Sequence, residues 1–161
     1  MEIKKDVNNF RNDCQNKRKL LQLFLQEQVS EKRKEWNMEQ KFYICEHCGN
    51  IIEMVKDVGV PVMCCGQKMK ELVPGTTDAA FEKHVPDYKV EGSRVIVNVG
   101  SVEHPMMPEH YIEWVALQTK QGVQRKVLRP EDKPSVCFAI CDGDEVEAVY
   151  AYCNLHSLWK A

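Results

Sequence analysis

Four cysteines within one short stretch have the residue type and the spacing of a metal site. Cys45 and Cys48 form a C-x2-C pair, Cys64 and Cys65 are adjacent, and a glycine follows each pair. A two-residue gap lets a tight turn point both sulfurs at one ion, and four thiolates form a soft tetrahedral site for zinc or a single iron. Ligand type alone leaves the choice between these metals open.

Two details of this group lead to separate expectations. The side chains of adjacent residues tend to diverge, so ligation by both Cys64 and Cys65 should distort the tetrahedron. His47 lies between the first two cysteines. Because four thiolates already close such a site, we predict that His47 is exposed and is not a ligand.

The other four histidines and one more cysteine form a second group. These histidines lie in or beside turn-like segments at strand ends: His84, His104, His110 and His156. Cys153 precedes the last of them by three residues, near enough to share one metal with it. Loops on a rigid β scaffold are where sites are usually built, and a thiolate with imidazoles suits iron, zinc or copper. A structural role explains any one of these histidines, but it explains the whole group less well.

The composition excludes several classes of protein. The chain has 161 residues, of which 43% are hydrophobic and 29% charged, and its net charge of −2 does not favour nucleic acid or an anionic membrane as a partner. No stretch approaches the roughly 18 apolar residues of a membrane span, and the first residues lack the apolar core of a signal peptide. We therefore expect a cytoplasmic protein, in which eight cysteines indicate metal or redox chemistry more than disulfides.

A small β unit is expected to position the four cysteines. Short strands are predicted over 42–44, 51–55 and 60–63, separated by glycine and aspartate. A unit this short has little hydrophobic core and needs another source of stability, for which a bound metal ion is the obvious choice. Residues 74–78 are turn-rich and mark a linker, so we divide the chain into 1–37, 38–74 and 75–161.

The third segment is expected to form an antiparallel β-sandwich or barrel, because its hydrophobic period is two and turn signals separate most of its strands. Strands are predicted over 94–99, 111–119, 123–128, 136–141 and 146–153. Cys137 and Cys141 share one face of the fourth strand, and we interpret both as small buried apolar residues.

The first segment differs from the rest of the chain. Residues 1–37 hold nine basic and six acidic residues, a net charge of +3, so the other 124 residues carry −5. An uninterrupted apolar stripe predicts a helix over 13–36. We interpret it as a solvated amphipathic helix that packs on the body or on a second chain, and a helix that binds nucleic acid or a partner is the weaker alternative. Cys14 is expected to be exposed.

From about Met38 to Ala161 the chain closely resembles desulfoferrodoxin, the two-iron class of superoxide reductase. The resemblance rests on the two cysteine pairs with their fifteen-residue gap, the segment Glu82-Lys83-His84-Val85-Pro86, the spacing of His104 and His110, and the ending Tyr152-Cys153-Asn154-Leu155-His156-Ser157-Leu158-Trp159-Lys160. Residues 1–37 lie outside it, and Met38 looks like a natural start. The extension is then either an upstream-start artefact or a real helical appendage for dimerisation or regulation.

The resemblance implies a mainly β fold, a cofactor content and a set of ligands. The small unit would be desulforedoxin-like, with iron on Cys45, Cys48, Cys64 and Cys65, although zinc remains open there. The larger unit would be an immunoglobulin-like β-sandwich that carries the active iron. Its ligands would be four equatorial histidines, His84, His104, His110 and His156, and an axial sulfur from Cys153.

The resemblance also implies a reaction. Superoxide would take one electron from the ferrous iron, at the position opposite Cys153, and two protons would give hydrogen peroxide. Lys83 would draw the anion to the site, and Glu82 would bind the ferric iron after the product leaves. Rubredoxin or a similar carrier would supply electrons, with a relay through the four-cysteine iron as an option. We also predict a homodimer.

Three competing readings remain. A metal-dependent binding module would hold zinc as a structural ribbon, but it would need neither the four histidines nor Cys153. An electron-transfer protein without catalysis would need neither an open metal position nor Lys83. A superoxide dismutase would also have to oxidise superoxide, which a thiolate ligand should disfavour.

Overall fold

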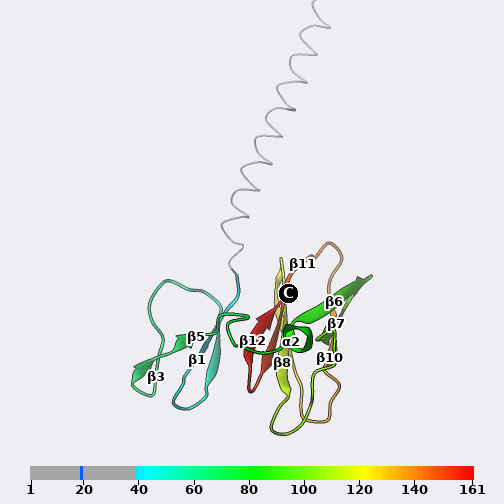
Figure 1. Cartoon of the computed structure of the whole chain (residues 1–161). Helices are drawn as coiled ribbons and strands as arrows, with labels where there is room; N and C mark the ends of the chain where they lie inside the picture. Colours follow the sequence, from blue (N-terminus) through cyan, green and yellow to red (C-terminus); the bar gives the residue numbers. More distant parts are fainter. Residues whose placement is uncertain (1–18, 20–38) are drawn as a thin grey trace, which may run out of the picture. The chain divides into compact units, whose positions relative to one another are not determined.

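A computed structural model of the chain describes Lys19 and residues 39–161 (Figure 1). The predicted extension 1–37, its helix over 13–36 and Cys14 lie outside the described residues, apart from Lys19, and stay predictions. Residues Gln40–Ala161 form one compact unit. The boundary that we expect near residue 74 stays a prediction within that unit.

The described chain is mainly β, as expected. Its strands are β1 (Lys41–Ile44), β2 (Ile51–Met54), β3 (Met63–Cys64), β4 (Gln67–Lys68), β5 (Lys70–Glu71), β6 (Pro86–Glu91), β7 (Arg94–Val99), β8 (Ile112–Thr119), β9 (Gly122–Val127), β10 (Ser135–Ala139), β11 (Val146–Cys153) and β12 (Ser157–Lys160). A short helix, α2 (Phe81–His84), precedes β6. Among the described residues, no helix has the length and hydrophobicity of a membrane span.

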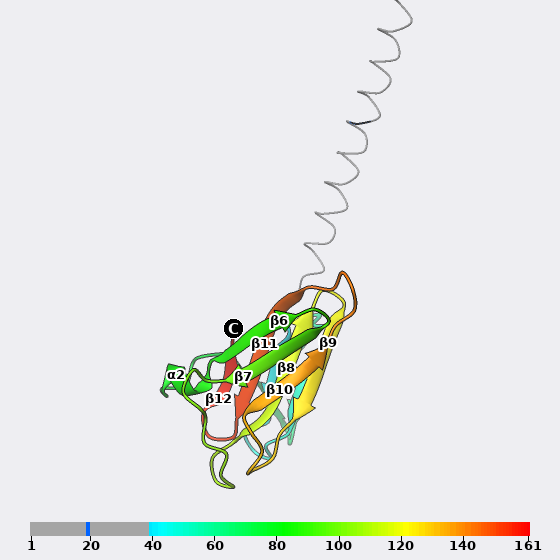
Figure 2. The same ribbon diagram turned by 90° about the vertical axis from the view of Figure 1, so that its right-hand side faces the viewer.

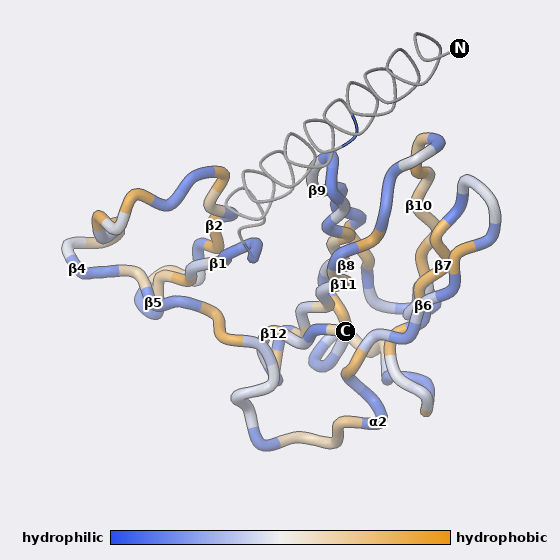
Figure 3. The backbone as a smooth tube through the Cα atoms, turned by 90° about the horizontal axis from the view of Figure 1, so that it is seen from above, coloured by the Kyte–Doolittle hydropathy of each residue, from blue (hydrophilic) through white to orange (hydrophobic). Residues whose placement is uncertain are grey.

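Two antiparallel sheets form the expected sandwich (Figure 2). One has the strand order β12-β11-β8-β9 and the other β10-β7-β6, the four-plus-three arrangement of a constant-type immunoglobulin domain. Alternate residues of β7, such as Val95 and Val97, pack against Val115, Leu117 and Val149 of the other sheet. The hydrophobic segments of β7 and β10 are visible in Figure 3. The sheets stay separate, so the alternative of a barrel is wrong.

The four-stranded sheet is buried on both of its faces. Trp114, Tyr150 and Tyr152 point away from the sandwich core and pack with Phe42 of the small β2-β1-β5 sheet. The Phe42 ring lies 4.9 Å from the ring of Trp114 and 5.4 Å from that of Tyr150. Such aromatic pairs add about 0.5–1.5 kcal/mol each beyond the area that they bury. This second layer explains why β8 and β11 are buried almost throughout, without the alternation of a one-sided strand.

Side chains of β9 cover the free edge of β10. Gln124 Nε2 donates to the Ala139 carbonyl over 2.7 Å, and Lys126 Nζ donates to the Cys137 carbonyl. The two strands are the outer members of different sheets. These bonds satisfy edge carbonyls that would otherwise be open to pairing with another strand.

The interpretation of Cys137 and Cys141 as buried is wrong, since both are exposed. In β10 it is Val136 and Phe138 that face the core, so Cys137 points to the opposite face, and Cys141 lies beyond the end of the strand. The sequence showed that side chains alternate between two faces of the strand, but it did not show which face is buried.

Further differences concern strands. The short strands β4 and β5 were not predicted, since each has only two residues. β6 and β12 were not predicted either, because β6 is rich in charged residues and β12 follows directly on the predicted ligand loop. The predicted strand over 60–63 is mostly wrong, since only Met63 of it belongs to β3. Proline at position 61 lacks the N–H group that a strand ladder needs.

Gly100 allows the end of β7 to approach α2. Its φ is +84°, and a Cβ there would lie 2.6 Å from the Lys83 carbonyl oxygen and 2.4 Å from that of Val102. Its N–H donates to the Val85 carbonyl over 3.1 Å. Only glycine combines this backbone conformation with this close approach. The end of β7 thereby fixes the helix that carries His84.

Candidate metal centres

The structure brings the five residues of the predicted histidine–cysteine group together. His84 ends α2, His104 and His110 lie in the connection between β7 and β8, Cys153 ends β11, and His156 lies in the turn before β12. One donor atom of each lies within 4.8 Å of the donor atoms of all the others. Five side chains from separate segments therefore face one point, as a metal site requires.

The four imidazoles form a closed ring. Taken in the order His84, His104, His110, His156, neighbouring rings have centroids 4.6–4.8 Å apart and planes at 77–80°. The opposite rings of His84 and His110 are 6.1 Å apart and nearly parallel, at 27°. This is a square arrangement, with four nitrogen donors around a common centre.

Hydrogen bonds fix which nitrogen points inward in two of the four rings. His84 Nδ1 lies 2.7 Å from the Ala80 carbonyl oxygen, and His104 Nδ1 lies 2.5 Å from that of Pro105. A carbonyl accepts only, so Nδ1 carries the proton in both rings and Nε2 keeps its lone pair for a metal. The ring of His156 is reversed, since its Nδ1 lies 2.9 Å from His84 Nε2. Two nitrogen ligands at right angles, each about 2.1 Å from an ion, would be about 3 Å apart.

Two nitrogen atoms of the group have no hydrogen-bond partner although they are buried. These atoms are His104 Nε2 and His110 Nε2. Buried polar atoms are almost always satisfied in folded proteins, and a site for a metal ion is one of the few explanations for an exception. The residues therefore fit a metal ion that accepts both lone pairs.

The Cys153 sulfur completes the donor set. It lies 3.6 Å from His156 Nδ1 and is fully buried. Burial raises the pKa of this thiol, while the backbone N–H groups of His156 and Leu155 point at the sulfur and lower it. Those two donors would stabilise a thiolate in the form that binds metal.

Trp159 supports two of these histidines, and sequence reasoning treated it only as part of a motif. Its fully buried ring stacks on His84 with centroids 4.9 Å apart and planes at 24°. Its Nε1 donates to the His156 carbonyl over 2.9 Å. The carbonyls of Ala80 and Pro105 were also missed, because a backbone acceptor leaves no signal in residue type.

Glu82 and Lys83 lie on α2, directly before His84, and both are exposed. Burial is the main cause of the lowered pKa of His84 and His110, and the Lys83 charge lowers both further, while Glu82 raises that of His84. The Glu82 carbonyl accepts from Val102 N–H over 2.9 Å, which ties the helix down. Within the described part of the chain neither side chain forms an ion pair, so the two residues do not neutralise each other as an ordinary surface pair would.

The four predicted cysteines of the small unit also meet. Their sulfurs all lie within 4.8 Å of one another, with 3.7 Å between Cys48 and Cys64 and 3.9 Å between Cys64 and Cys65. A regular tetrahedron with metal–sulfur bonds of about 2.3 Å has edges of about 3.8 Å. These sulfurs therefore fit one tetrahedral ion, and His47 is exposed as predicted.

The adjacent pair converges through its backbone. Cys65 and Gly66 have φ of +49° and +76° and connect β3 to β4 as a two-residue hairpin turn, in which both residues are left-handed. This conformation is uncommon for a residue with a side chain. The expected distortion thus lies in the backbone at Cys65, while the two sulfur distances from Cys64 stay near the tetrahedral value.

The cysteine thiols of this group differ in pKa. The Cys48 N–H, followed by the His47 N–H, holds the pKa of Cys45 down to about 6. Hydrogen bonds with the Cys48 and Cys64 sulfurs raise the pKa of Cys65 to about 12. One thiolate is therefore ready near neutral pH, and a cation is needed to bring the others to the same state.

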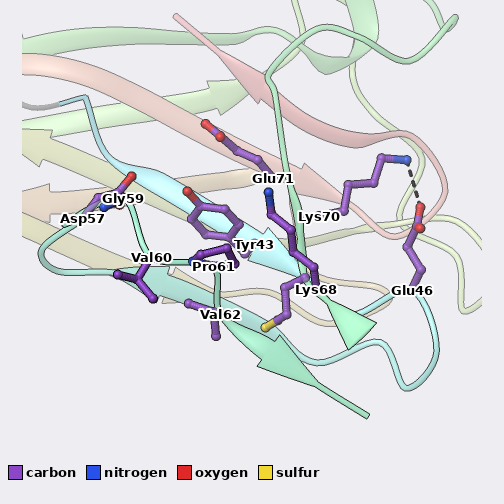
Figure 4. A pocket seen from close by; sticks show the side chains of 11 residues that line it. Tyr43, Glu46, Asp57, Gly59, Val60, Pro61, Val62, Lys68, Lys70 and Glu71 are labelled. Carbon is purple, nitrogen blue, oxygen red and sulfur yellow. Dashed lines mark hydrogen bonds and ion pairs between the residues drawn. The ribbon is translucent and has the colours of Figure 1, made fainter. Parts of the chain in front are cut away.

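A groove of about 490 Å³ lies beside the small sheet (Figure 4). Tyr43, Asp57 and Glu71 line it together with Lys68 and residues 59–62. At its rim Lys70 and Glu46 form an ion pair of 2.8 Å. None of the ligands of either candidate centre lines this groove, so the chemistry that the sequence predicts lies elsewhere.

We predict that the metal-free protein loses stability as the pH falls from about 6.5 to about 4. Burial lowers the pKa of His84 and His110, and lowers that of His104 to about 4 from the ordinary value of 6.5. In this window the unfolded chain binds more protons than the folded chain, so acid favours unfolding. Thermal unfolding at a series of pH values measures the effect.

His104→Gln is the matched variant, because it keeps a polar side chain of similar size that does not titrate. Its melting temperature should fall less than that of the wild type over the same pH range. An equal fall in both proteins would contradict the assignment of this pH dependence to His104.

Comparisons with known proteins agree with this geometry. The family model for desulfoferrodoxin matches residues 76–161. A desulfoferrodoxin homolog of Archaeoglobus fulgidus is 47% identical over 119 residues, which are 74% of this chain and 94% of the relative. The desulfoferrodoxin of Clostridium acetobutylicum is 42% identical over 126 residues, 78% of this chain and 98% of the relative. The crystal structure of the superoxide reductase from Treponema pallidum has a TM-score of 0.66 and 41% identity, and the match covers 77% of this chain and 99% of that one.

Proposed function

The chain belongs to the desulfoferrodoxin family, and on this basis we propose that it is a superoxide reductase, which reduces superoxide to hydrogen peroxide at a non-haem iron. The observation that carries the proposal is the closed ring of four imidazoles with the Cys153 sulfur beside it. A relative of known structure that is named a superoxide reductase matches over 99% of its length.

The proposal assigns two iron ions to each chain. His84, His104, His110, Cys153 and His156 would hold the catalytic iron, and Cys45, Cys48, Cys64 and Cys65 would hold the other, with zinc as an alternative in that site. Ferrous iron in the first site would supply one electron to superoxide, which becomes hydrogen peroxide with two protons. A catalytic metal site keeps a position open for its substrate, and here that substrate would be a small anion.

Lys83 and Glu82 are the proposed catalytic residues. Superoxide is an anion, and the Lys83 charge is close enough to lower the pKa of His84 and His110. A positive charge at the mouth of a site raises the rate at which an anion arrives. Glu82 is exposed beside it, and its carboxylate would act as a ligand for the oxidised iron once the product has left.

The remaining assignments are also proposals. A rubredoxin-type carrier would return the electron, the protein would be a homodimer, and the cytoplasm would be its compartment. The domains would be 38–74 and 75–161, each with one iron. A zinc-stapled binding module or a simple electron carrier is the alternative function. The binding module has no use for four imidazoles around one point. The electron carrier has no use for an open metal position or for Lys83.

The proposed function predicts a stoichiometry. Fully reduced protein should consume superoxide in pulse radiolysis and yield one hydrogen peroxide for each superoxide, without release of dioxygen. A dismutase would give one peroxide and one dioxygen for every two superoxide ions. That second stoichiometry, or the absence of any reaction by iron-loaded protein, would contradict the proposal.

Lys83→Ala should slow the second-order reaction with superoxide by about tenfold or more, because electrostatic steering of an anion is lost. The iron content should stay at the wild-type level, since Lys83 is not a ligand. Pulse radiolysis at several salt concentrations measures both the rate and its ionic-strength dependence.

Lys89→Ala is the control, because Lys89 is an exposed lysine of β6 and not of α2. It should react at nearly the wild-type rate. If Lys83→Ala also keeps the wild-type rate and salt dependence, the steering role is wrong.

A further inference from the structure

Asn154 connects the two loops that carry three of the proposed ligands. It lies between Cys153 and His156, but its side chain reaches across to the loop that holds His110. Its Oδ1 accepts from the Tyr111 N–H over 2.9 Å, and its Nδ2 donates to the Glu109 carbonyl over 3.0 Å. A third bond, of 3.2 Å, runs from its own backbone N–H to the Tyr111 carbonyl.

These bonds enclose His110 from both sides. Glu109 and Tyr111 are its immediate neighbours, so one amide side chain fixes the peptide groups before and after the ligand. Two backbone hydrogen bonds of 2.9 and 3.0 Å also join His110 to Met107, within its own loop. Of these two sets of contacts, Asn154 makes the one that reaches the other ligand loop.

His110 needs this support more than its neighbours do. The rings of His84 and His104 are oriented by a hydrogen bond from Nδ1 to a backbone carbonyl. Within the described residues, His110 Nδ1 has no such partner, and its Nε2 is buried without one. An outer hydrogen bond to a ligating imidazole normally fixes its orientation. For His110 that task falls on the backbone.

We propose that Asn154 is a positioning residue that fixes His110 in the metal centre by holding Glu109 and Tyr111. The inference rests on the proposed function only in taking His110 as a metal ligand. Asn154 would also set the spacing between His110 and Cys153, because the same amide oxygen lies 3.9 Å from the Cys153 sulfur. One residue thereby couples an imidazole from one loop to the thiolate of the other.

The test compares iron-loaded wild type with Asn154→Ala, which removes both side-chain bonds. Gln124→Ala is the matched control, because it also removes an amide-to-backbone hydrogen bond, but between β9 and β10. The first readout is the rate at which a strong chelator removes iron from the histidine-ligated site. Loss of an outer-shell partner typically costs 10–100-fold in metal affinity, and we expect release from Asn154→Ala to be faster by about that factor.

The second readout separates positioning from simple stability. Displacement of His110 changes the symmetry of the ligand field, so the ferric EPR signal of the histidine-ligated iron should change in rhombicity in Asn154→Ala and not in Gln124→Ala. If Asn154→Ala yields no folded protein, Asn154→Ser is measured against the same expectations.

An unchanged rate of iron release or an unchanged EPR signal would overturn the proposal for Asn154. Faster release with an unchanged signal would show that Asn154 supports only the fold of the two loops. If the wild type itself holds no iron at the histidines, the proposed function fails instead, so the two failures are distinguishable.

Discussion

Four imidazoles face one point, and at least two of them, His84 and His104, turn an unprotonated nitrogen toward it. Such an arrangement is unfavourable without a cation. Each buried polar atom left without a partner costs about 1–3 kcal/mol, and two atoms of this group, His104 Nε2 and His110 Nε2, are in that position. A metal ion satisfies both atoms at once and favours the neutral form of the rings, as burial does by lowering the pKa of His84, His104 and His110. The loops that carry these residues must therefore hold the four rings in place around one metal ion.

The scaffold meets the requirement by making the surrounding elements rigid. The four-stranded sheet packs on both faces, against β6, β7 and β10 on one side and against Phe42 on the other. Cys153 is at the end of β11, which is buried from Ala148 onward, and Gly100 lets the end of β7 meet the helix that carries His84. Only the loops at one end of the sandwich then remain to be fixed. Hydrogen bonds and ring stacking hold these loops, and they come from the Ala80 and Pro105 carbonyls, Trp159 and Asn154.

Residue types and spacing predicted which side chains meet in each centre and most of the strands, because ligand chemistry and a period of two are local properties of the chain. They did not predict the reversed ring of His156 or the left-handed backbone of Cys65, which depend on contacts distant in sequence. The exposure of Cys137 was missed for a related reason. Alternation fixes two faces, and only packing decides which one is buried.

The most direct test of this account is the metal content of the wild type and of His104→Ala, by element-resolved mass spectrometry on protein purified without oxygen. The account predicts about two metal ions per wild-type chain, at least one of them iron, and the loss of about one iron in the variant. Zinc alone in the wild type, or the same iron content in both proteins, would contradict the assignment of the histidine–cysteine group as an iron centre.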